Sequence, residues 1–336
     1  MRVLVTGGTG FVGSHTTVAL LRAGHDVRLL VRRPEQVAVT FTPHGVVPHD
    51  VVVGDVLDDA SVRRAVRRCD AVVHAAAVFD LDPRHEARLA SNVVATRQVL
   101  RAAVDERCDP IVHVSSSVAL IRQGGSDPSL PLGDVDRPYS RSKIDSERQA
   151  RALQDLGRPV VSVYPGGVHG PHDPYVGDQA TRMIIVARGL LPLWPTGGML
   201  YVDVREVATL IAAIVQPGHA PRRYVVPGHH LGRQEYFAAV SRAIGRPRGA
   251  LSMSPALARA STTSIRAVQR VLPERVRYPA DPEAVELHLR DCRLDDTPAR
   301  TELGIVPRPW QETVDDTITW LVDAGRLPGR YRPVRT

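Results

Sequence analysis

Two kinds of segment alternate along the first half of the chain. Short apolar runs, rich in Val and without polar alternation, recur at 2–6, 26–31, 50–54, 71–75, 110–115 and 159–164. Such runs are typical of strands buried on both faces of a parallel sheet. Longer segments with helical spacing of apolar residues lie between them, at 12–23, 58–67, 85–107 and 138–156. The pattern predicts an α/β fold with a doubly wound parallel sheet and a ligand across the carboxyl ends of its strands.

The alternation stops at a Pro- and Gly-rich stretch, residues 165–198. Beyond it, Val204 to Val215 predicts a helix and Tyr224 to Val226 a strand that returns to the sheet. We therefore expect one domain over residues 1–165, to which residues 204–228 return, and a smaller, interleaved substrate lobe that makes up most of residues 166–336. Residues 250–300 are rich in Arg and Pro and predict nothing definite, whereas Gln311 to Val322 predicts a final amphipathic helix.

The turn after the first apolar run carries a glycine pattern. Gly7, Gly10 and Gly13 are spaced as TGxxGxxG, and Gly8, Gly10 and Gly13 also satisfy GxGxxG. Glycines at this spacing allow a tight turn, let the backbone approach a pyrophosphate, and let the next helix pack closely on the strand. Because a strand precedes the turn and a helix and a second strand follow it, the context is that of a dinucleotide site.

Lys143 is the only lysine among 43 basic residues, and it follows Tyr139 by four positions. Positions four apart share a face of a helix, so the ammonium can approach the phenol. Pro138 suits the first turn of a helix, which places Tyr139 near the positive end of the helix dipole. Both effects favour the phenolate, and the pair is therefore a candidate acid and base for proton transfer.

Composition and charge limit the location and partners that we expect. The first strand starts at residue 2, which leaves no signal peptide, and no apolar run approaches the ~18 residues of a membrane span. Cys69, Cys108 and Cys292 are few and far apart, which favours reduced thiols and a cytoplasmic protein. The net charge is +7, but arginines are scattered among carboxylates and 4% aromatic content offers little for base stacking, so nucleic acid is not expected.

The end of the second apolar run bears on the choice of dinucleotide. Val31 stands where an NAD enzyme usually places an acidic residue for the ribose 2′-hydroxyl, and Arg32 and Arg33 follow it. Arginine at this point accommodates the 2′-phosphate of NADP. The sequence thus favours NADP (NADPH) as the cofactor. His169, His172, His229 and His230 lie in Gly/Pro loops without a cysteine or carboxylate pattern, and no metal is expected.

These motifs together resemble the extended short-chain dehydrogenase/reductases of the NAD-dependent epimerase/dehydratase superfamily. The resemblance rests on Thr6 to Gly13, Gly54-Asp55, His74 to Ala77, Ser115 to Ser117, and Tyr139 with Lys143, and it covers about the first 170 residues. Two stretches, from Val31 to Pro34 and from Tyr164 to Pro171, look most like the branch of dihydroflavonol 4-reductase and related ketone reductases. Asn92 matches the helix asparagine of the family, and an ordinary place on a helix surface is the alternative.

The resemblance implies roles for particular residues. Ser117, the last of three serines, would hold the substrate oxygen, with Ser116 as the alternative, while Tyr139 gives the proton and Lys143 reaches the nicotinamide ribose. The residues expected to bind the cofactor are Gly7, Thr9, Gly10, Phe11, Val12, Gly13, Arg32, Arg33, Asp55, Val56, Ala75, Ala76, Ala77, Lys143, Tyr164, Pro165, Gly167 and Val168. His74 and His113 lie in strands and are expected to be packed rather than catalytic.

Three classes of function remain open. The first is an NADP-dependent oxidoreductase that transfers hydride between the nicotinamide and a carbonyl or alcohol of a small, fairly apolar substrate, a hydroxysteroid among the possibilities. The second is a nucleotide-sugar epimerase, and the third a non-catalytic NADP-binding regulator, although regulators generally lose the Tyr or the Lys. Dehydratases of the superfamily follow the catalytic hydroxyl with Asp-Glu, whereas Val118-Ala119 follows Ser117 here. A homodimer through helices 85–107 and 138–156 is also possible, with Leu89, Val93, Leu100 and Val104 as half of its surface.

Overall fold

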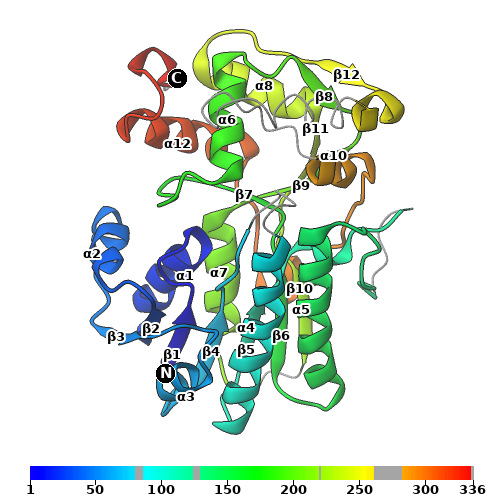
Figure 1. The fold of residues 1–336 in the computed structure, drawn as a ribbon. Coiled ribbons are helices and arrows are strands. Elements are labelled where there is room, and N and C mark those ends of the chain that lie inside the picture. Colours follow the sequence, from blue (N-terminus) through cyan, green and yellow to red (C-terminus); the bar gives the residue numbers. More distant parts are fainter. Residues whose placement is uncertain (80–85, 124–128, 219–220, 261–281, 334–336) are drawn as a thin grey trace.

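A seven-stranded parallel sheet lies at the centre of the larger domain (Figure 1). The structure is a computed structural model that describes residues 1–79, 86–123, 129–218, 221–260 and 282–333. The strand order is β10-β6-β5-β4-β1-β2-β3, so the direction of winding reverses between β1 and β4. The strands are β1 (Arg2–Thr6), β2 (Asp26–Val31), β3 (Asp50–Val53), β4 (Ala71–His74), β5 (Ile111–Val114), β6 (Val160–Tyr164) and β10 (Arg222–Val225). This is the doubly wound Rossmann arrangement that the sequence predicts.

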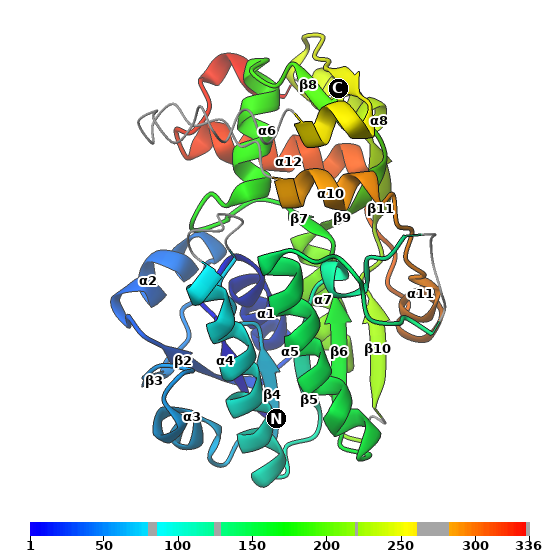
Figure 2. The ribbon, with the colours of Figure 1, turned by 45° about the vertical axis from the view of Figure 1, so that its right-hand side comes forward.

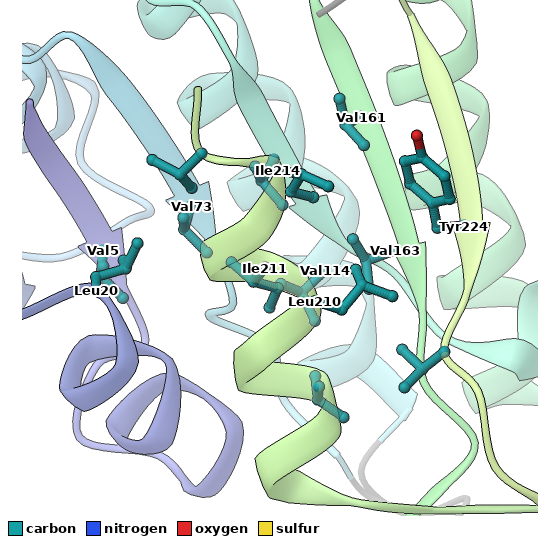
Figure 3. Packing of buried hydrophobic residues seen from close by; sticks show 14 of the residues in the cluster. Val5, Leu20, Val73, Val114, Val161, Val163, Leu210, Ile211, Ile214 and Tyr224 are labelled. Carbon is teal, nitrogen blue, oxygen red and sulfur yellow. The ribbon is translucent and has the colours of Figure 1, made fainter. Parts of the chain in front are cut away.

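Side chains on successive strand positions enter two separate cores. Val3 and Val5 of β1 pack into one hydrophobic cluster, whereas Leu4 between them packs into another. Because both faces of the strands are covered, the strand sequences are apolar throughout and lack polar alternation. On one face, Leu210, Ile211 and Ile214 of a single helix point toward the sheet (Figure 3).

Helices cover both faces of this sheet (Figure 2). One face carries α3 (Asp59–Val66), α4 (Glu86–Asp105) and α5 (Pro138–Asp155). The other carries α1 (Phe11–Arg22), α2 (Glu35–Phe41) and α7 (Val204–Ile214), with α11 (Thr297–Leu303) beside α7 and β10. The helix α7 and the strand β10 are thus late segments of the chain that pack on the N-terminal sheet.

The second lobe has its own core and lies beyond the carboxyl ends of the strands (Figure 1). It contains two small sheets, of order β11-β9-β7 and β12-β8. Its elements are β7 (Gly167–His169), α6 (Asp178–Arg188), β8 (Leu193–Pro195), β9 (Gly198–Asp203), β11 (His229–Gly232), α8 (Arg233–Ile244), β12 (Leu251–Met253), α10 (Pro282–Leu289) and α12 (Trp310–Asp323). The two termini lie in different lobes, as Figure 1 shows.

The predicted dimer surface on α4 is wrong in two of its four residues. Leu89 is 2% exposed and Leu100 is fully buried, because both pack inside the chain's own clusters. The apolar residues on more than one face of α4 reflect its contacts with both the sheet and the helix α5 beside it.

No helix among the described residues is both long and apolar enough to cross a bilayer. All three cysteines are buried, and none forms a disulfide.

Candidate active site

The turn between β1 and α1 requires glycine at two positions. Gly7 has φ +72°, and a Cβ atom there would lie 2.6 Å from the backbone nitrogen of Ala76. A Cβ atom at Gly13 would lie 2.1 Å from the carbonyl oxygen of Gly7. The amide of Gly10 donates to the same carbonyl at 2.9 Å, and no side chain caps the start of α1. The first amides of α1 therefore remain available for an anion such as a pyrophosphate.

A cavity of about 510 Å³ opens beside this turn, at the carboxyl ends of the parallel strands. Loops after β1, β4, β5 and β6 form its floor, and α6 and α10 of the second lobe form its other side. The predicted residues that line it are Gly7, Gly10, Phe11, Val12, Gly13, Ala75, Ala77, Ser117, Tyr139, Lys143, Pro165, Gly167 and Val168. The fold thus brings most of the predicted residues together from the segments that follow β1, β4, β5 and β6 and from the helix α5.

The remaining predicted residues do not line the cavity. Arg32 and Arg33 are exposed at the end of β2, and neither side chain bonds a protein group among the described residues. Asp55 accepts from the amide of Leu57 at 3.0 Å, just after β3, with Val56 beside it.

Three further positions lie behind the cavity wall or in the turn itself. The phenol of Tyr164 is fully buried and donates to Glu147 at 2.6 Å, so its side chain belongs to the core and not to the cofactor cleft. Ala76 meets the glycine turn through its backbone. Thr9 is part of the turn.

Tyr139 lies in the first turn of α5, directly after Pro138. Its side chain is 6% exposed, and the ring packs edge-on against Phe79 with centroids 4.9 Å apart. Burial raises the pKa of Tyr139 well above its ordinary value, and a hydrogen bond with the Ser116 hydroxyl opposes this rise. The phenol is therefore protonated at neutral pH.

Lys143 follows one turn later, with its Nζ 5.9 Å from the centroid of the Tyr139 ring. The side chain is 7% exposed, and burial lowers the pKa of Lys143 to about 8, while Glu147 raises it. The expected lowering of the phenol pKa is not observed in this structure. The reason is that the phenol is desolvated and the ammonium lies over the ring.

The structure distinguishes the neighbouring serines. The backbone amide of Ser115 donates a hydrogen bond to the carbonyl of Val163 at 2.9 Å, which continues the pairing of β5 with β6. The chain then leaves the sheet. The Ser116 Oγ accepts from the amide of Val118 at 3.2 Å, and the Ser116 hydroxyl acts to lower the pKa of the Tyr139 phenol. Ser117, the predicted hydroxyl, also lines the cavity, and its amide donates to Pro165 at 2.8 Å. Ser116, the alternative, is thus the serine whose hydroxyl influences the pKa of Tyr139.

Sequence reasoning missed a carboxylate from the second lobe. Glu283, in the first turn of α10, is 3% exposed. Its oxygens accept from the amide and the hydroxyl of Ser140, both at 2.6 Å, and from the amide of Tyr139 at 3.2 Å. Arg137, the residue before α5, supplies no side-chain cap. An arginine at the N-cap position was the only sign in the sequence that another group must cap α5. It does not reveal which residue supplies that cap.

Asn92 of α4 is buried rather than on the helix surface. Its side-chain oxygen accepts from the amide of Val78 at 2.7 Å, and its side-chain nitrogen donates to the carbonyl of Val78 at 2.9 Å. The same nitrogen is 3.4 Å from the hydroxyl of Ser142 on α5. Asn92 therefore fixes the loop after β4, next to Phe79 in the cavity wall.

The two strand histidines are packed, as expected. His74 and His113 are buried side by side, with ring centroids 5.9 Å apart, and burial lowers the pKa of His113 to about 3. His169 lies 3.2 Å from the Tyr236 hydroxyl in the second lobe. In the described parts of the chain, no group of three or more His, Cys, Asp or Glu is arranged to hold a metal ion.

The sequence matches the model of the "NAD dependent epimerase/dehydratase family" over residues 3–226. Three curated relatives align with nearly the whole chain. "Sterol demethylase protein B" of Methylococcus capsulatus is 26% identical over 332 residues, covering 97% of this chain and 100% of the relative. "Putative dihydroflavonol 4-reductase" of Synechocystis is 28% identical over 335 residues, covering 96% of this chain and 94% of the relative. The "4-hydroxy-2-methyl-3-oxo-4-farnesyl-3,4-dihydroquinoline-1-oxide ketoreductase" of Stigmatella aurantiaca is 28% identical over 338 residues, covering 97% of this chain and 98% of the relative.

Solved structures share the whole fold. UDP-glucose 4-epimerase from Bifidobacterium longum, solved in complex with NAD+ and UDP, superposes with a TM-score of 0.74 at 21% identity, covering 97% of this chain and 99% of that one. At this identity the likeness shows the fold alone. Because the family match spans about two thirds of the chain, from the glycine turn to the end of the large sheet, this protein belongs to the NAD-dependent epimerase/dehydratase family.

Proposed function

We propose that this protein is an NADP-dependent oxidoreductase that transfers hydride between the nicotinamide and a carbonyl or alcohol of a small, fairly apolar substrate. One observation carries the proposal: the Tyr139 phenol, the Ser116 hydroxyl and the Lys143 ammonium converge on a cavity that is continuous with the glycine turn. Two of the curated relatives are named as a reductase and a ketoreductase, which supports the same class of reaction.

The residues divide the acid and base work between them. When bound, the nicotinamide supplies the hydride in reduction and accepts it in oxidation. Ser116 donates a hydrogen bond to the substrate oxygen and fixes it beside the phenol. Tyr139 donates its proton to that oxygen as the carbonyl becomes an alcohol, and the resulting phenolate recovers a proton from solvent. Lys143 donates to the ribose hydroxyls and stabilises the phenolate.

The raised pKa of Tyr139 matters for the direction of proton transfer. A phenol that is protonated at neutral pH is ready to act as an acid, which suits reduction of a carbonyl. In the opposite direction the same group must first lose its proton, so oxidation is expected to accelerate as the pH rises.

The cofactor preference is argued from the end of β2. Arg32 and Arg33 are exposed, and no protein carboxylate among the described residues engages them. Val31 is 4% exposed, and its side chain has no oxygen that could accept from a ribose 2′-hydroxyl. Two free guanidiniums without an acid suit a 2′-phosphate, which arginine binds through charge-assisted hydrogen bonds.

Consumption of NADPH, followed by absorbance with a panel of apolar ketones and aldehydes, tests the proposal. We expect turnover with at least one ketone and a preference for NADPH over NADH. Turnover of a UDP-sugar to its epimer, with no net consumption of NADPH on any ketone, would instead establish the epimerase alternative.

A further inference from the structure

The cavity has a polar end that the proposed reaction does not use. Asp178, Gln179 and Arg182 lie in the first two turns of α6 and line the cavity from the second lobe. The wall around them is largely apolar and includes Met199 and Leu287. A cluster of polar groups in such a wall normally fixes the orientation of a bound molecule.

Arg182 is held in place by two contacts. Its Nη2 donates to Asp178 Oδ2 at 3.2 Å, as expected for positions four apart on a helix, and its guanidinium lies 5.7 Å from the Trp194 ring centroid. The Arg182 side chain is only 15% exposed. A guanidinium held in this way loses little freedom when it binds a further group.

One donor and one acceptor at this end lack a partner among the described residues. They are the Nε–H of Arg182 and the Oε1 of Gln179, both buried. The orientation of the Gln179 amide follows from its other atom, since Nε2 donates to Asp178 Oδ2 at 3.3 Å and an oxygen in that place would be repelled. Buried groups without partners cost free energy, and a ligand that pairs with them recovers it.

The two side chains are neighbours, because Gln179 Nε2 and Arg182 Nη2 both donate to the same oxygen of Asp178. Together they offer one donor and one acceptor. A hydroxyl group has the complementary pair, since it accepts with its oxygen and donates with its hydrogen.

The charged side chains that line the cavity leave no excess positive charge for an anionic substrate. Among the described lining residues, the cations Lys143 and Arg182 are matched by the carboxylates Asp173 and Asp178. Burial lowers the pKa of His288 to about 4, so this residue is neutral. Because Asp178 already neutralises Arg182, a substrate carboxylate would meet no excess positive charge.

We propose that the substrate carries, besides the reacting carbonyl, a hydroxyl group that accepts a hydrogen bond from Arg182 and donates one to Gln179. Both atoms are covered in this structure, so the two side chains must shift before the hydroxyl can reach them. The substrate class is therefore an uncharged, largely apolar hydroxyketone. This inference rests on the proposed function, because it presumes that a carbonyl reacts at Tyr139.

The test uses decalone, a bicyclic apolar ketone, with its monohydroxylated positional isomers, their methyl ethers and the matching carboxylic acids. With NADPH as the reductant, we expect kcat/KM for at least one hydroxydecalone to exceed that for decalone and for its own methyl ether by about 10-fold, as a charge-assisted hydrogen bond predicts. Arg182→Met should remove this preference, so that the hydroxydecalone and its methyl ether are reduced with similar kcat/KM. Gln179→Leu, which leaves the Arg182–Asp178 pair intact, should reduce it by a smaller factor.

Arg188→Met is the matched control, because Arg188 lies at the far end of α6 and bonds a surface carbonyl. It should leave the preference unchanged. Equal rates for the ketone and all its hydroxyl derivatives, a preference for the carboxylic acids, or a loss of activity on every ketone in both α6 variants would overturn the inference alone. A protein that reduces none of the ketones overturns the proposed function, and the inference falls with it.

Discussion

Glu283 and Ser140 are 143 residues apart in the chain, yet the carboxylate of Glu283 accepts two hydrogen bonds of 2.6 Å from Ser140, one from its amide and one from its hydroxyl. The carboxylate thus caps α5 from another lobe, next to Tyr139, and it lies at the positive end of the helix dipole. The same helix α10 that carries Glu283 also lines the cavity. One residue therefore couples the wall of the cavity to the position of the phenol.

Replacing Glu283 by Ala should lower both stability and turnover. The hydrogen bonds from Ser140 and Tyr139 to a buried carboxylate are lost, and hydrogen bonds to charged groups are worth about 1.5–3 kcal/mol each before relaxation. We expect a loss of about 2–4 kcal/mol in unfolding free energy, measured by denaturant titration, and a fall in kcat of about 10-fold. Ser140→Ala, which removes one of the three bonds, should show a smaller effect of the same kind.

Glu86→Ala is the control for this prediction. Glu86 also contacts α5, through Arg141 at 2.7 Å, but the pair is on the surface with both side chains about half exposed. Exposed pairs contribute about 0–1 kcal/mol. If the two glutamate variants lose equal stability, Glu283 has no special role as a cap.

Replacing Tyr139 by Phe should lower kcat by about 10²-fold or more and leave the dissociation constant of NADPH nearly unchanged, because only the proton donor is removed. Tyr175→Phe is the matched control, since Tyr175 lines the same cavity with 55% of its side chain exposed. Steady-state kinetics and cofactor titration measure the two quantities. Near-normal turnover in the Tyr139 variant would remove the assignment.

Alanine variants of Ser116 and Ser117 are expected to lower kcat by very different factors. Ser116→Ala should lower kcat by about 10²-fold, because the hydroxyl that meets both the phenol and the substrate oxygen is lost. Ser117→Ala should lower kcat by less than about 10-fold, since Ser117 bonds Pro165 through its backbone amide, which alanine retains. The reverse order would restore Ser117 as the catalytic hydroxyl.

Replacing Arg32 and Arg33 together by Ala should weaken NADPH binding by about 10-fold or more and leave NADH binding almost unchanged, because only NADPH carries the 2′-phosphate. Arg97 and Arg101, both exposed on α4, are the control pair for the same change in net charge. The dissociation constants must be compared at one salt concentration. Equal losses for both cofactors would show that the arginines act only through the general surface charge.

The buried ammonium of Lys143 predicts a pH dependence of stability. Its pKa falls from 10.5 to about 8 through burial, which corresponds to about 3 kcal/mol of destabilisation while both states are protonated. Between pH 8 and 10.5 the unfolded chain binds more protons at this group than the folded chain, so this cost declines as the pH rises. Lys143→Met should therefore be more stable than the unmodified protein by up to about 3 kcal/mol at pH 7 and by about 1 kcal/mol at pH 10. A gap in unfolding free energy that stays constant with pH would contradict this.

The strands of the large sheet were predictable because each is marked by a continuous apolar run in its own sequence. The strands predicted at 2–6, 26–31 and 71–75 match β1, β2 and β4 to within one residue, since a strand buried on both faces must be apolar throughout. The helix α6 was missed because it begins directly after Gly177 within a Pro- and Gly-rich stretch, where the sequence pattern indicates only loop. Helix α8, which begins at Arg233, lies beyond the first 170 or so residues, to which the sequence resemblance is confined.

The residues of the candidate site were predictable where a motif fixes the backbone conformation. They were not predictable where the role depends on which way a side chain points. Gly7 and Gly13 follow from steric necessity. Tyr164 was predicted from the stretch Tyr164 to Pro171, yet its side chain faces the core, and sequence position alone does not give that direction. Glu283 and Arg182 come from elements that only the folded lobes bring to the cavity, so no spacing along the chain indicates them.

The position of β10 has a consequence for biosynthesis. β6 ends at Tyr164, whereas the strand that covers its outer edge begins at Arg222. At about 5–20 residues per second, a ribosome takes roughly 3 to 12 s to make the intervening chain. During that interval the edge of β6 offers unpaired amides and carbonyls to any neighbouring nascent chain. Chaperone engagement is thus expected to peak on chains that have passed Tyr164 and to fall once Val225 has emerged.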